Sequence, residues 1–388
     1  MKPNTLKRID NTIGRMMLVL LRPVVFCIDK FCSRRVFPDQ PKKISFLKIL
    51  GGGSLLIAYP AILSIRKQFP QARLILVCAK EVAVYAELTD LFDEIVPINT
   101  GSISAIAQSS LRAIQACFAS DFFVNYELHS KLSAIFAALT CSTERFGLYQ
   151  DWNRWQERYI NHPVFYNSAT PIYVGYEQIA RKTGATPVEW SAACRHFQSH
   201  LGFQRAASAS ASDKSTLIGV AAFCSALYKE RQFSNEEFAQ ILDRHSPESG
   251  AEVMILGGRA DLEPATALAG VIESQLPLLS VKNMAGKTSL RDVVHLFERF
   301  TFLLSIDSGL NHIARLLQIP TITYWGPSDP QSRLKEINPA YESVFYQKIS
   351  CAPCVHLIDL PPCAGNNVCM KQFVQPRLAE ISNDGWEI

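Results

Sequence analysis

The sequence predicts an α/β protein made of two Rossmann-like domains whose parallel sheets face a central cleft. The main observation is a regular alternation of short apolar segments of strand length with longer segments of helical periodicity. This alternation begins at residue 44, stops near residue 150 and resumes near residue 215. A chain of 388 residues, 48% of them hydrophobic, is also long enough to form two cores.

The first domain is expected over residues 44–165. Its predicted strands cover residues 44–50, 73–79, 94–98 and 121–128, and its predicted helices cover 55–69, 82–92, 103–118 and 131–139. Because strands and helices alternate, parallel strands joined by crossover helices are the economical arrangement. Ligands of such a sheet bind beyond the carboxyl ends of its strands.

Residues 166–214 are expected to link the domains, because this region contains prolines and ends in the small-residue run from Ala206 to Ser212. The second domain is expected over residues 215–345. Its predicted strands cover 217–223, 253–257, 278–281, 302–306 and 321–325, and its helices cover 235–243, 262–274, 290–300 and 309–317. Residues 346–388 then form a cysteine-containing tail.

The first 43 residues form a basic segment that differs from the rest of the chain. They contain ten Lys or Arg and three Asp, whereas the remaining residues contain 29 basic and 32 acidic side chains. A mildly acidic body does not favour nucleic acid as a partner. The apolar run 16–28 is broken by Arg22-Pro23 and is shorter than the roughly 20 residues that span a bilayer. No small-residue cleavage site follows it, so a secretory signal is not favoured.

This basic segment is expected to lie at a membrane interface, with apolar residues among the lipid headgroups and basic residues against anionic lipid. A helix packed on the body of the protein is the alternative. The eleven cysteines, an odd number, do not indicate a secreted disulfide framework and favour a reducing cytosol. We therefore expect a cytoplasmic protein, peripheral at the inner face of the cytoplasmic membrane. The basic residues assigned to lipid contact are Lys2, Lys7, Arg8, Arg15, Arg34 and Arg35.

A junction between a predicted strand and a predicted helix carries the clearest functional signal. The apolar strand 302–306 is followed by Asp307 and Ser308, which are favoured N-cap residues for the next helix. Free backbone N–H groups at a helix start attract anions, Gly309 lets a ligand approach the backbone, and His312 adds a donor of tunable charge. A nucleotide diphosphate fits this chemistry. The alternative is that Asp307 and Ser308 only cap the helix and that His312 is a satisfied, partly buried histidine.

The stretch from Asp307 to Pro330 resembles the C-terminal signature of glycosyltransferase family 9, the lipopolysaccharide heptosyltransferases. That signature reads D-[ST]-G-x-x-H-x-A, then a proline, a strand and G-P-[ST]-x-P. The matching residues are Asp307, Ser308, Gly309, His312, Ala314, Pro320, Gly326, Pro327, Ser328 and Pro330. The resemblance extends over about residues 44 to 375 and is compatible with the GT-B architecture that two facing Rossmann-like domains suggest.

The turn Gly51-Gly52-Gly53-Ser54 is expected on the acceptor side, where its glycines allow positive φ and close passage of a substrate. Many members of the family carry an aspartate here that is taken as the base deprotonating the acceptor, and Ser54 holds the matching position. A serine hydroxyl cannot act as a general base near neutral pH unless another group takes its proton. Simple turn geometry is the alternative role for the glycines.

Glu127, at the end of the predicted strand 121–128, is the residue we predict as the catalytic base, because it is a carboxylate at the carboxyl end of a strand in the same domain. Its neighbour His129 is a weaker candidate. Glu127 could instead bind acceptor hydroxyls or cap the helix that follows Ser130. With no base at all, the protein would bind nucleotide sugars without transferring them.

Three segments of the second domain are expected to bind the donor. Lys229 and Arg231 resemble the family's basic segment and would face the diphosphate, although a solvated helix start is the alternative. Glu263 matches the acidic position of the family's G-G-x-x-[DE]-x-E turn and would hold the ribose hydroxyls. Asn283 or Met284 would meet the nucleobase.

Four cysteines close to the C-terminus form a second distinctive cluster: Cys351, Cys354, Cys363 and Cys369. Two cysteines spaced as C-x2-C can give two thiolates to one tetrahedral metal, so a structural zinc is expected as one possibility. An iron–sulfur cluster, reduced thiols and disulfides are the others. Some family members carry a similar tail.

The function implied by the resemblance is inverting, metal-independent transfer of a sugar, with heptose from ADP-heptose as the expected donor and a lipopolysaccharide core or related glycolipid as the acceptor. The chemistry would be a direct displacement in which Lys229, Arg231, the amides near Ser308 and His312 stabilise the leaving diphosphate. A catalytically silent nucleotide-sugar-binding protein and a transferase of another activated hexose are the alternatives.

Overall fold

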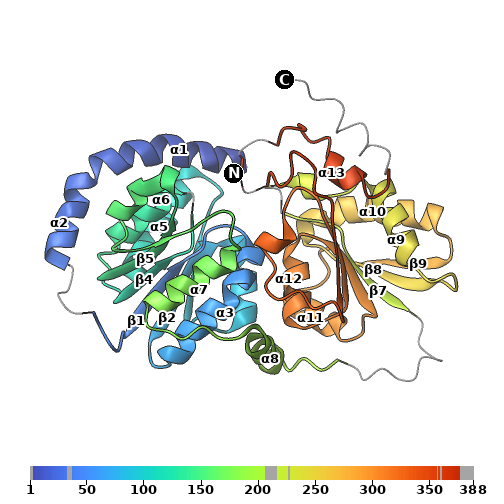
Figure 1. The fold of residues 1–388 in the computed structure, drawn as a ribbon, viewed down its shortest axis with the longest axis horizontal. Coiled ribbons are helices and arrows are strands. Elements are labelled where there is room, and N and C mark those ends of the chain that lie inside the picture. The colour runs from blue at the N-terminus through green and yellow to red at the C-terminus, as the bar shows by residue number, and fades with distance from the viewer. Residues whose placement is uncertain are drawn as a thin grey trace. The chain divides into compact units, whose positions relative to one another are not determined.

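The computed structural model describes residues 3–32, 37–128, 130–205, 216–225, 228–355, 357–358 and 361–375. The chain forms two compact units, Met1–Ala193 and Cys194–Ile388. Each unit contains one six-stranded parallel sheet with helices packed on it (Figure 1). The α/β class and the two Rossmann-like domains predicted from the sequence are therefore confirmed.

The sheet of the first unit has the strand order β3-β2-β1-β4-β5-β6, and every neighbouring pair is parallel. The strands are β1 (Lys43–Leu47), β2 (Arg73–Ala79), β3 (Glu94–Ile98), β4 (Phe122–Asn125), β5 (Glu144–Tyr149) and β6 (His162–Phe165). The central strands are apolar on both faces because helices cover both sides of the sheet.

The helices of the first unit form the two outer layers. They are α3 (Gly52–Gln68), α4 (Lys80–Thr89), α5 (Ile103–Cys117), α6 (Lys131–Leu139) and α7 (Ile172–Lys182), with a 3₁₀ helix at Asp151–Arg158 and α8 (Trp190–Leu201) at the unit boundary. Helices α5 and α6 pack on one face through Ala113 and Phe136, which join a core with Val77 and Phe123. Helix α3 packs against α4 and α7.

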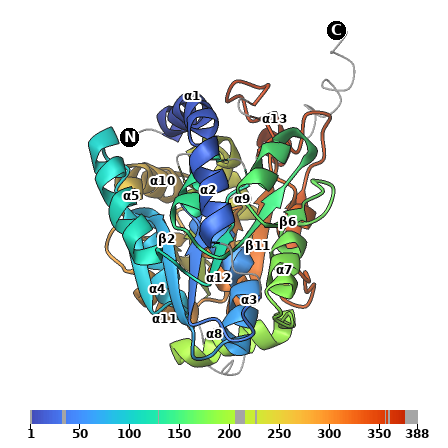
Figure 2. The same ribbon diagram turned by 90° about the vertical axis from the view of Figure 1, so that its left-hand side faces the viewer.

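Two further helices precede the first sheet, α1 (Pro3–Leu20) and α2 (Arg22–Cys32). Leu18 and Val25 are buried in a cluster with Ala134 and Ile135 of α6. This side of the two helices therefore packs on the body of the first unit, as in the alternative to a membrane-interface segment. Figure 2 shows α2 turning away from α1 at the bend between them. Among the described residues, no single helix is long and apolar enough to cross a membrane; Asp10–Leu20 and Arg22–Ile28, bent by 61°, reach that length and composition only together.

The sheet of the second unit has the order β12-β11-β10-β7-β8-β9 and is also parallel. Its strands are β7 (Leu217–Ala221), β8 (Ala251–Ile255), β9 (Leu279–Asn283), β10 (Phe302–Ile306), β11 (Thr321–Trp325) and β12 (Glu342–Tyr346). Its helices are α9 (Asn235–His245), α10 (Leu262–Gln275), α11 (Leu290–Phe297), α12 (Gly309–Leu316) and the short α13 (Val368–Lys371). Ser234 with Glu237 and Ser289 with Asp292 form capping boxes that fix the starts of α9 and α11.

Several elements differ from the sequence prediction. The predicted strands 44–50 and 121–128 end at Leu47 and Asn125, because the residues beyond them belong to loops at the carboxyl edge. Residues 150–214, where no regular alternation was expected, contain β6, α7 and α8. Strands β5 and β12 were not predicted. The run Ala206 to Ser212 lies outside the described residues, and the predicted domain boundaries stay predictions.

Candidate functional site

Each sheet has one position where the chain reverses direction across the strands, between β1 and β4 in the first unit and between β7 and β10 in the second. The loops that leave two such neighbouring strands diverge, and ligands of open α/β sheets bind in the resulting crevice at the carboxyl ends. Polar residues follow all four strands. Lys48 follows β1, Glu127 follows β4, Arg231 lies in the loop after β7, and Asp307 follows β10 directly.

Asp307 is the centre of a buried polar cluster in the second unit. Its Oδ2 accepts a hydrogen bond from the Ser328 hydroxyl at 2.8 Å and one from the Arg231 guanidinium at 3.2 Å. The same Arg231 Nη1 donates to the Asp307 backbone carbonyl at 2.9 Å. His312 Nε2 lies 3.6 Å from the other carboxylate oxygen. The sequence signature therefore brings Asp307, His312 and Ser328 together, and Arg231 joins them.

The charges in this cluster are strongly coupled. Burial alone would raise the pKa of Asp307, but the Arg231 guanidinium and His312 outweigh burial and hold that pKa well below its ordinary value. Burial lowers the pKa of His312 more than Asp307 raises it, so His312 is neutral at pH 7. Burial by itself would lower the pKa of Arg231, but Asp307 outweighs burial and raises this pKa above its ordinary value. The cluster is a compensated ion pair beside a neutral imidazole.

Helix α12 starts beside this cluster. Ser308 is its N-cap, with extended backbone at φ −140° and ψ 164°, and its hydroxyl accepts from the Asn311 amide at 3.3 Å. The Ser305 hydroxyl lies 3.1 Å from the Ser308 hydroxyl. Because the first amides of a helix have no acceptor within the helix, the start of α12 at Gly309 is suited to an anion.

Lys229 and Arg231, both predicted to face a diphosphate, occupy different environments. Arg231 is largely buried and its guanidinium contacts Asp307, so it neutralises that carboxylate. Lys229 is exposed at the start of the 3₁₀ helix Lys229–Arg231. In the described part of the chain, no ion pair of the Lys229 ammonium is recorded, which leaves Lys229 as the cation better placed to meet an external anion.

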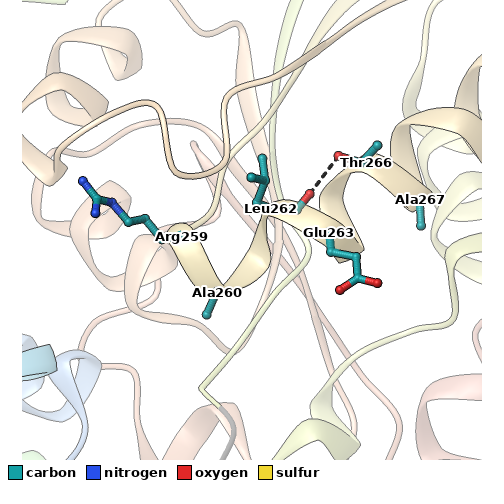
Figure 3. A pocket seen from close by; sticks show the side chains of 6 residues that line it. All are labelled: Arg259, Ala260, Leu262, Glu263, Thr266 and Ala267. Carbon is teal, nitrogen blue, oxygen red and sulfur yellow. Dashed lines mark hydrogen bonds between the residues drawn. The ribbon is translucent and has the colours of Figure 1, made fainter.

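A shallow depression of about 690 Å³ lies over the start of α10 (Figure 3). It contains Glu263, the residue that we predict to bind the ribose. Its lining residues are Arg259, Ala260, Leu262, Glu263, Thr266 and Ala267. The turn before it is tight, since a Cβ added at Gly257 would lie 2.8 Å from the Asp261 Cβ. Asn283, a candidate for nucleobase contact, donates to the Thr266 hydroxyl at 3.0 Å beside this depression. The lining shares no residue with the Asp307 cluster.

In the first unit, Glu127 joins the loops after β1 and β4. Its Oε1 accepts from the Lys48 ammonium at 3.1 Å and from the Ile49 and Leu50 amides at 2.8 and 3.3 Å. Among the described residues, no hydrogen bond to Oε2 is recorded. The side chains of Lys48 and Glu127 are only 8% and 15% exposed, so water screens the pair weakly. Sequence reasoning missed Lys48, although a lysine directly after a buried strand and before a glycine turn was a usable signal.

The glycine turn after Lys48 leads into helix α3. Gly51, at the N-cap, has φ 85° and ψ 85°, a left-handed conformation that glycine adopts without strain. A Cβ added at Gly52 would lie 2.2 Å from the Tyr85 ring, so this position also requires glycine. Gly53 and Ser54 follow in the first turn of α3 and are partly buried. His129, the weaker candidate for the base, lies outside the described residues.

The cysteine tail packs against the loop that follows β11. The backbone amides of Cys354 and Val355 both donate to the Pro327 carbonyl, at 3.0 and 2.9 Å. A Cβ added at Gly326 would lie 2.9 Å from the Cys369 sulfur, so the tail needs glycine there. Burial raises the pKa of the Cys369 thiol to about 12. Cys351 is exposed and Cys363 is partly buried.

The zinc expected for these four cysteines stays a prediction. Over the residues that the structure describes, no group of three or more His, Cys, Asp or Glu side chains is placed to hold a metal ion. The pKa of Cys351 and that of Cys354 are raised as well, chiefly by burial. In this conformation the tail acts through packing on Gly326 and Pro327.

Comparisons with solved structures identify the fold. The chain is similar to the glycosyltransferase family 9 structure from Veillonella parvula, with a TM-score of 0.57 and 19% identity over 79% of this chain and 86% of that one. It is similar to the Escherichia coli ADP-heptose LPS heptosyltransferase II, with a TM-score of 0.55 and 17% identity over 86% of this chain and 99% of that one. These similarities show the GT-B fold.

The sequence comparisons identify the family. The sequence model of "Glycosyltransferase family 9 (heptosyltransferase)" matches residues 129–363, which is more than half of the chain. The lipooligosaccharide heptosyltransferase 2 of Haemophilus influenzae is 34% identical over 82 residues, and the lipopolysaccharide heptosyltransferase 2 of Salmonella typhimurium is 31% identical over 81. Each of these matches covers 21% of this chain and 23% of the relative. The chain belongs to glycosyltransferase family 9, as its C-terminal signature indicated.

Proposed function

We propose that this chain transfers a sugar from a nucleotide-activated donor, heptose from ADP-heptose, to a lipopolysaccharide core or a related glycolipid. Family membership supports a glycosyltransferase, and relatives named as heptosyltransferases support this sugar. A similar solved structure is of an Escherichia coli heptosyltransferase with ADP, at a TM-score of 0.57 and 18% identity. The observation that carries the proposal is the Asp307 cluster at the start of α12.

The cluster suggests a division of labour in donor binding. Asp307 is ionised, yet Arg231 compensates its charge, so it does not repel a diphosphate strongly. The amides at the start of α12 and the exposed Lys229 would bind the diphosphate. Glu263 would hold ribose at the α10 depression. Of these groups, the amides and Lys229 would stabilise the departing diphosphate without a metal ion.

We propose that the transfer inverts the anomeric carbon by direct displacement, with Glu127 as the base for the acceptor hydroxyl. Glu127 Oε1 is occupied by Lys48 and two amides, and Oε2 is the oxygen on which a proton would be taken up. Lys48 is then a positioning residue for this carboxylate. It orients the carboxylate, and it holds Oε1 so that Oε2 is left to face the acceptor.

The second candidate is a protein that binds nucleotide sugars without transferring them. Ser54 favours it, because this residue holds the position of the family's usual aspartate and cannot replace a carboxylate base. The engagement of Glu127 with Lys48 is compatible with a purely structural role for this pair. Transfer of a different activated hexose is a variant of the main proposal, since neither the sugar nor the nucleobase is specified by the contacts described.

We also propose that the protein works in the cytoplasm at the inner face of the membrane, where a glycolipid acceptor would be reached. The basic composition of residues 1–43 supports this location.

Calorimetric titration of the purified protein with ADP, GDP and UDP tests the donor site. ADP is expected to bind, and Lys229→Ala should weaken that binding about tenfold, because a hydrogen bond to a charged group contributes about 1.5 to 3 kcal/mol. The control is Lys282→Ala on the edge strand β9, whose ammonium is paired with Glu252 at 2.8 Å. Affinity for ADP should be the same with and without EDTA. Equal affinity of both variants would remove Lys229 from the donor site.

A further inference from the structure

Helices α1 and α2 carry an apolar face that points away from the body of the first unit. Met16, Val19 and Leu20 of α1 are 57%, 61% and 65% exposed, and Val24 and Phe26 of α2 are 44% and 68% exposed. The spacing of Met16, Val19 and Leu20 places them on one side of α1. On α2, Phe26 shares one side with Arg22 and Lys30, which are four positions before and after it, and Val24 lies on another side. We call the exposed apolar residues of the two helices, Met16, Val19, Leu20, Val24 and Phe26, the α1–α2 face.

The opposite side of the two helices is fixed on α6. Gly14, Leu18 and Val25 are buried, and the Tyr159 hydroxyl donates to the Leu18 carbonyl at 2.6 Å. Gly14 is required for this close packing, since a Cβ there would lie 2.8 Å from the Lys131 Cβ. The exposed residues therefore cannot turn inward without breaking a packed interface.

The charged residues of the two helices are also divided between an outward and an inward side. Arg15, Arg22 and Lys30 are exposed next to the apolar residues. Asp10 is turned inward, where Oδ1 accepts from the Ser130 hydroxyl at 2.8 Å and from the Leu132 amide at 2.9 Å, and Oδ2 accepts from the Lys131 amide at 3.0 Å. The outward face is consequently apolar and positively charged.

We infer that the α1–α2 face docks on an anionic lipid bilayer, and that Asp10 links this docked surface to the turn between β4 and α6, which carries Glu127. Apolar side chains beside arginine and lysine are the chemistry of an interfacial helix on anionic lipid. A second copy of the chain fits less well, because Arg15, Arg22 and Lys30 of two copies would repel each other. Docking on lipid rests on the proposed function in one respect only, which is that a glycolipid acceptor would lie in the same bilayer.

Sedimentation of the full chain with lipid vesicles tests the inference without donor or acceptor. Vesicles of phosphatidylcholine alone are compared with vesicles that also contain phosphatidylglycerol. The protein should partition onto the anionic vesicles, and added salt should weaken the partitioning because screening reduces the contribution of the basic residues. Lack of partitioning onto either kind of vesicle would overturn the inference, whatever the transferase assays show.

Two pairs of matched variants locate the contact. Leu20→Asp should weaken partitioning about tenfold or more, while Leu111→Asp, an equally exposed leucine at 64% on α5, should not change it. Arg22→Gln should weaken partitioning about fivefold, and Arg112→Gln on α5 should not. Circular dichroism of all four variants controls for folding. Equal losses in both members of a pair, or no loss in either, would contradict docking through this face.

Two further measurements separate the other ways in which the α1–α2 face could be covered. Light scattering should give the same mass for the wild type and Leu20→Asp, and a dimer that this substitution dissociates would assign the face to a second copy. Washing of cell membranes at alkaline pH should release the protein. Retention after that wash would mean that the bent pair Asp10–Leu20 and Arg22–Ile28 is inserted across the bilayer, which would contradict docking on the surface.

Discussion

At the scale of single residues, the Asp307 cluster shows how this fold keeps an ionised carboxylate and a neutral histidine side by side. Both side chains are buried, with 7% exposure for Asp307 and 6% for His312. The Arg231 guanidinium compensates the charge of the Asp307 carboxylate, so His312 does not have to be protonated to do so. A buried imidazole of this kind makes the stability of the protein depend on pH.

His312→Asn is predicted to flatten the acid side of the stability profile. In the unfolded chain a histidine titrates at about pH 6.5, whereas burial lowers the pKa of His312 in the folded protein. As the pH falls from about 7 to about 5, the unfolded chain takes up a proton that the folded chain resists, so the free energy of unfolding decreases. The variant lacks this contribution, and urea denaturation across this range measures the slope.

The matched control for this prediction is His295→Asn, which removes an exposed histidine from α11. Comparison of the two variants separates the loss of a buried histidine from the loss of an exposed one. A slope that is unchanged in His312→Asn would mean that His312 does not titrate differently in the folded protein.

Glu127→Gln is predicted to abolish sugar transfer while leaving ADP affinity unchanged. The glutamine carbonyl can still accept from the Ile49 and Leu50 amides, so the loop keeps its position, but the side chain can no longer take up a proton. Initial rates of transfer and calorimetric titration with ADP check the two parts. Glu87→Gln, on the exposed side of α4, is the control and should keep full activity. Full activity of Glu127→Gln would move the base to another residue.

Sequence patterns predicted which residues lie at the start of α12, but not the contacts that these residues make. Asp307, Ser308 and His312 could be predicted because a strand, an N-cap and a helix start are local features. Arg231 was expected at the diphosphate, and in the structure its guanidinium contacts Asp307. The direction of this long side chain depends on a carboxylate in the loop after β10, 76 positions away, which no local pattern indicates. The pairing of Lys48 with Glu127 joins two loops 79 positions apart, and no local pattern encodes it.

At the scale of secondary-structure elements, the strands that could be predicted are those whose residues form short apolar runs. Strands β2 and β10 were predicted at their observed residues because both faces are covered and the residues are almost all apolar. Strand β6 contains Pro163 and β12 alternates polar with apolar residues, as edge strands do. Those features interrupt the apolar run in these two strands, whereas the edge strand β3 keeps its apolar run and was predicted at its observed residues.

Asp10→Ala is predicted to lower the free energy of unfolding by about 1 to 2 kcal/mol. Asp10 of α1 accepts hydrogen bonds from the first turn of α6, in the manner of an N-cap supplied by another helix, and loss of a cap costs about 0.5 to 2 kcal/mol. Urea denaturation measures the change. The control is Asp39→Ala, an exposed aspartate that should change stability by less than about 0.5 kcal/mol. Equal effects of the two substitutions would mean that α1 does not hold the start of α6.

At the scale of the whole molecule, two parallel sheets place chemically different groups at their switch points. The first offers the carboxylate Glu127 with Lys48 beside a glycine turn, and the second offers a compensated carboxylate beside a helix start. This asymmetry suits an acceptor that must lose a proton and a donor that must lose a diphosphate. Composition and alternation predicted the two-domain α/β class because these are properties of the whole chain. The sugar and acceptor depend on loop contacts that no sequence pattern specifies.

The central claim is that the protein catalyses sugar transfer, and release of free nucleoside diphosphate tests it most directly. Purified protein is incubated with ADP-heptose and with ADP-, GDP- and UDP-hexoses, each with and without a truncated lipopolysaccharide acceptor. We predict release of ADP from ADP-heptose that requires the acceptor. Binding of nucleotide sugars with no release under any pairing would contradict transfer and favour a binding protein, and acceptor-dependent release only from another donor would contradict the assignment of heptose.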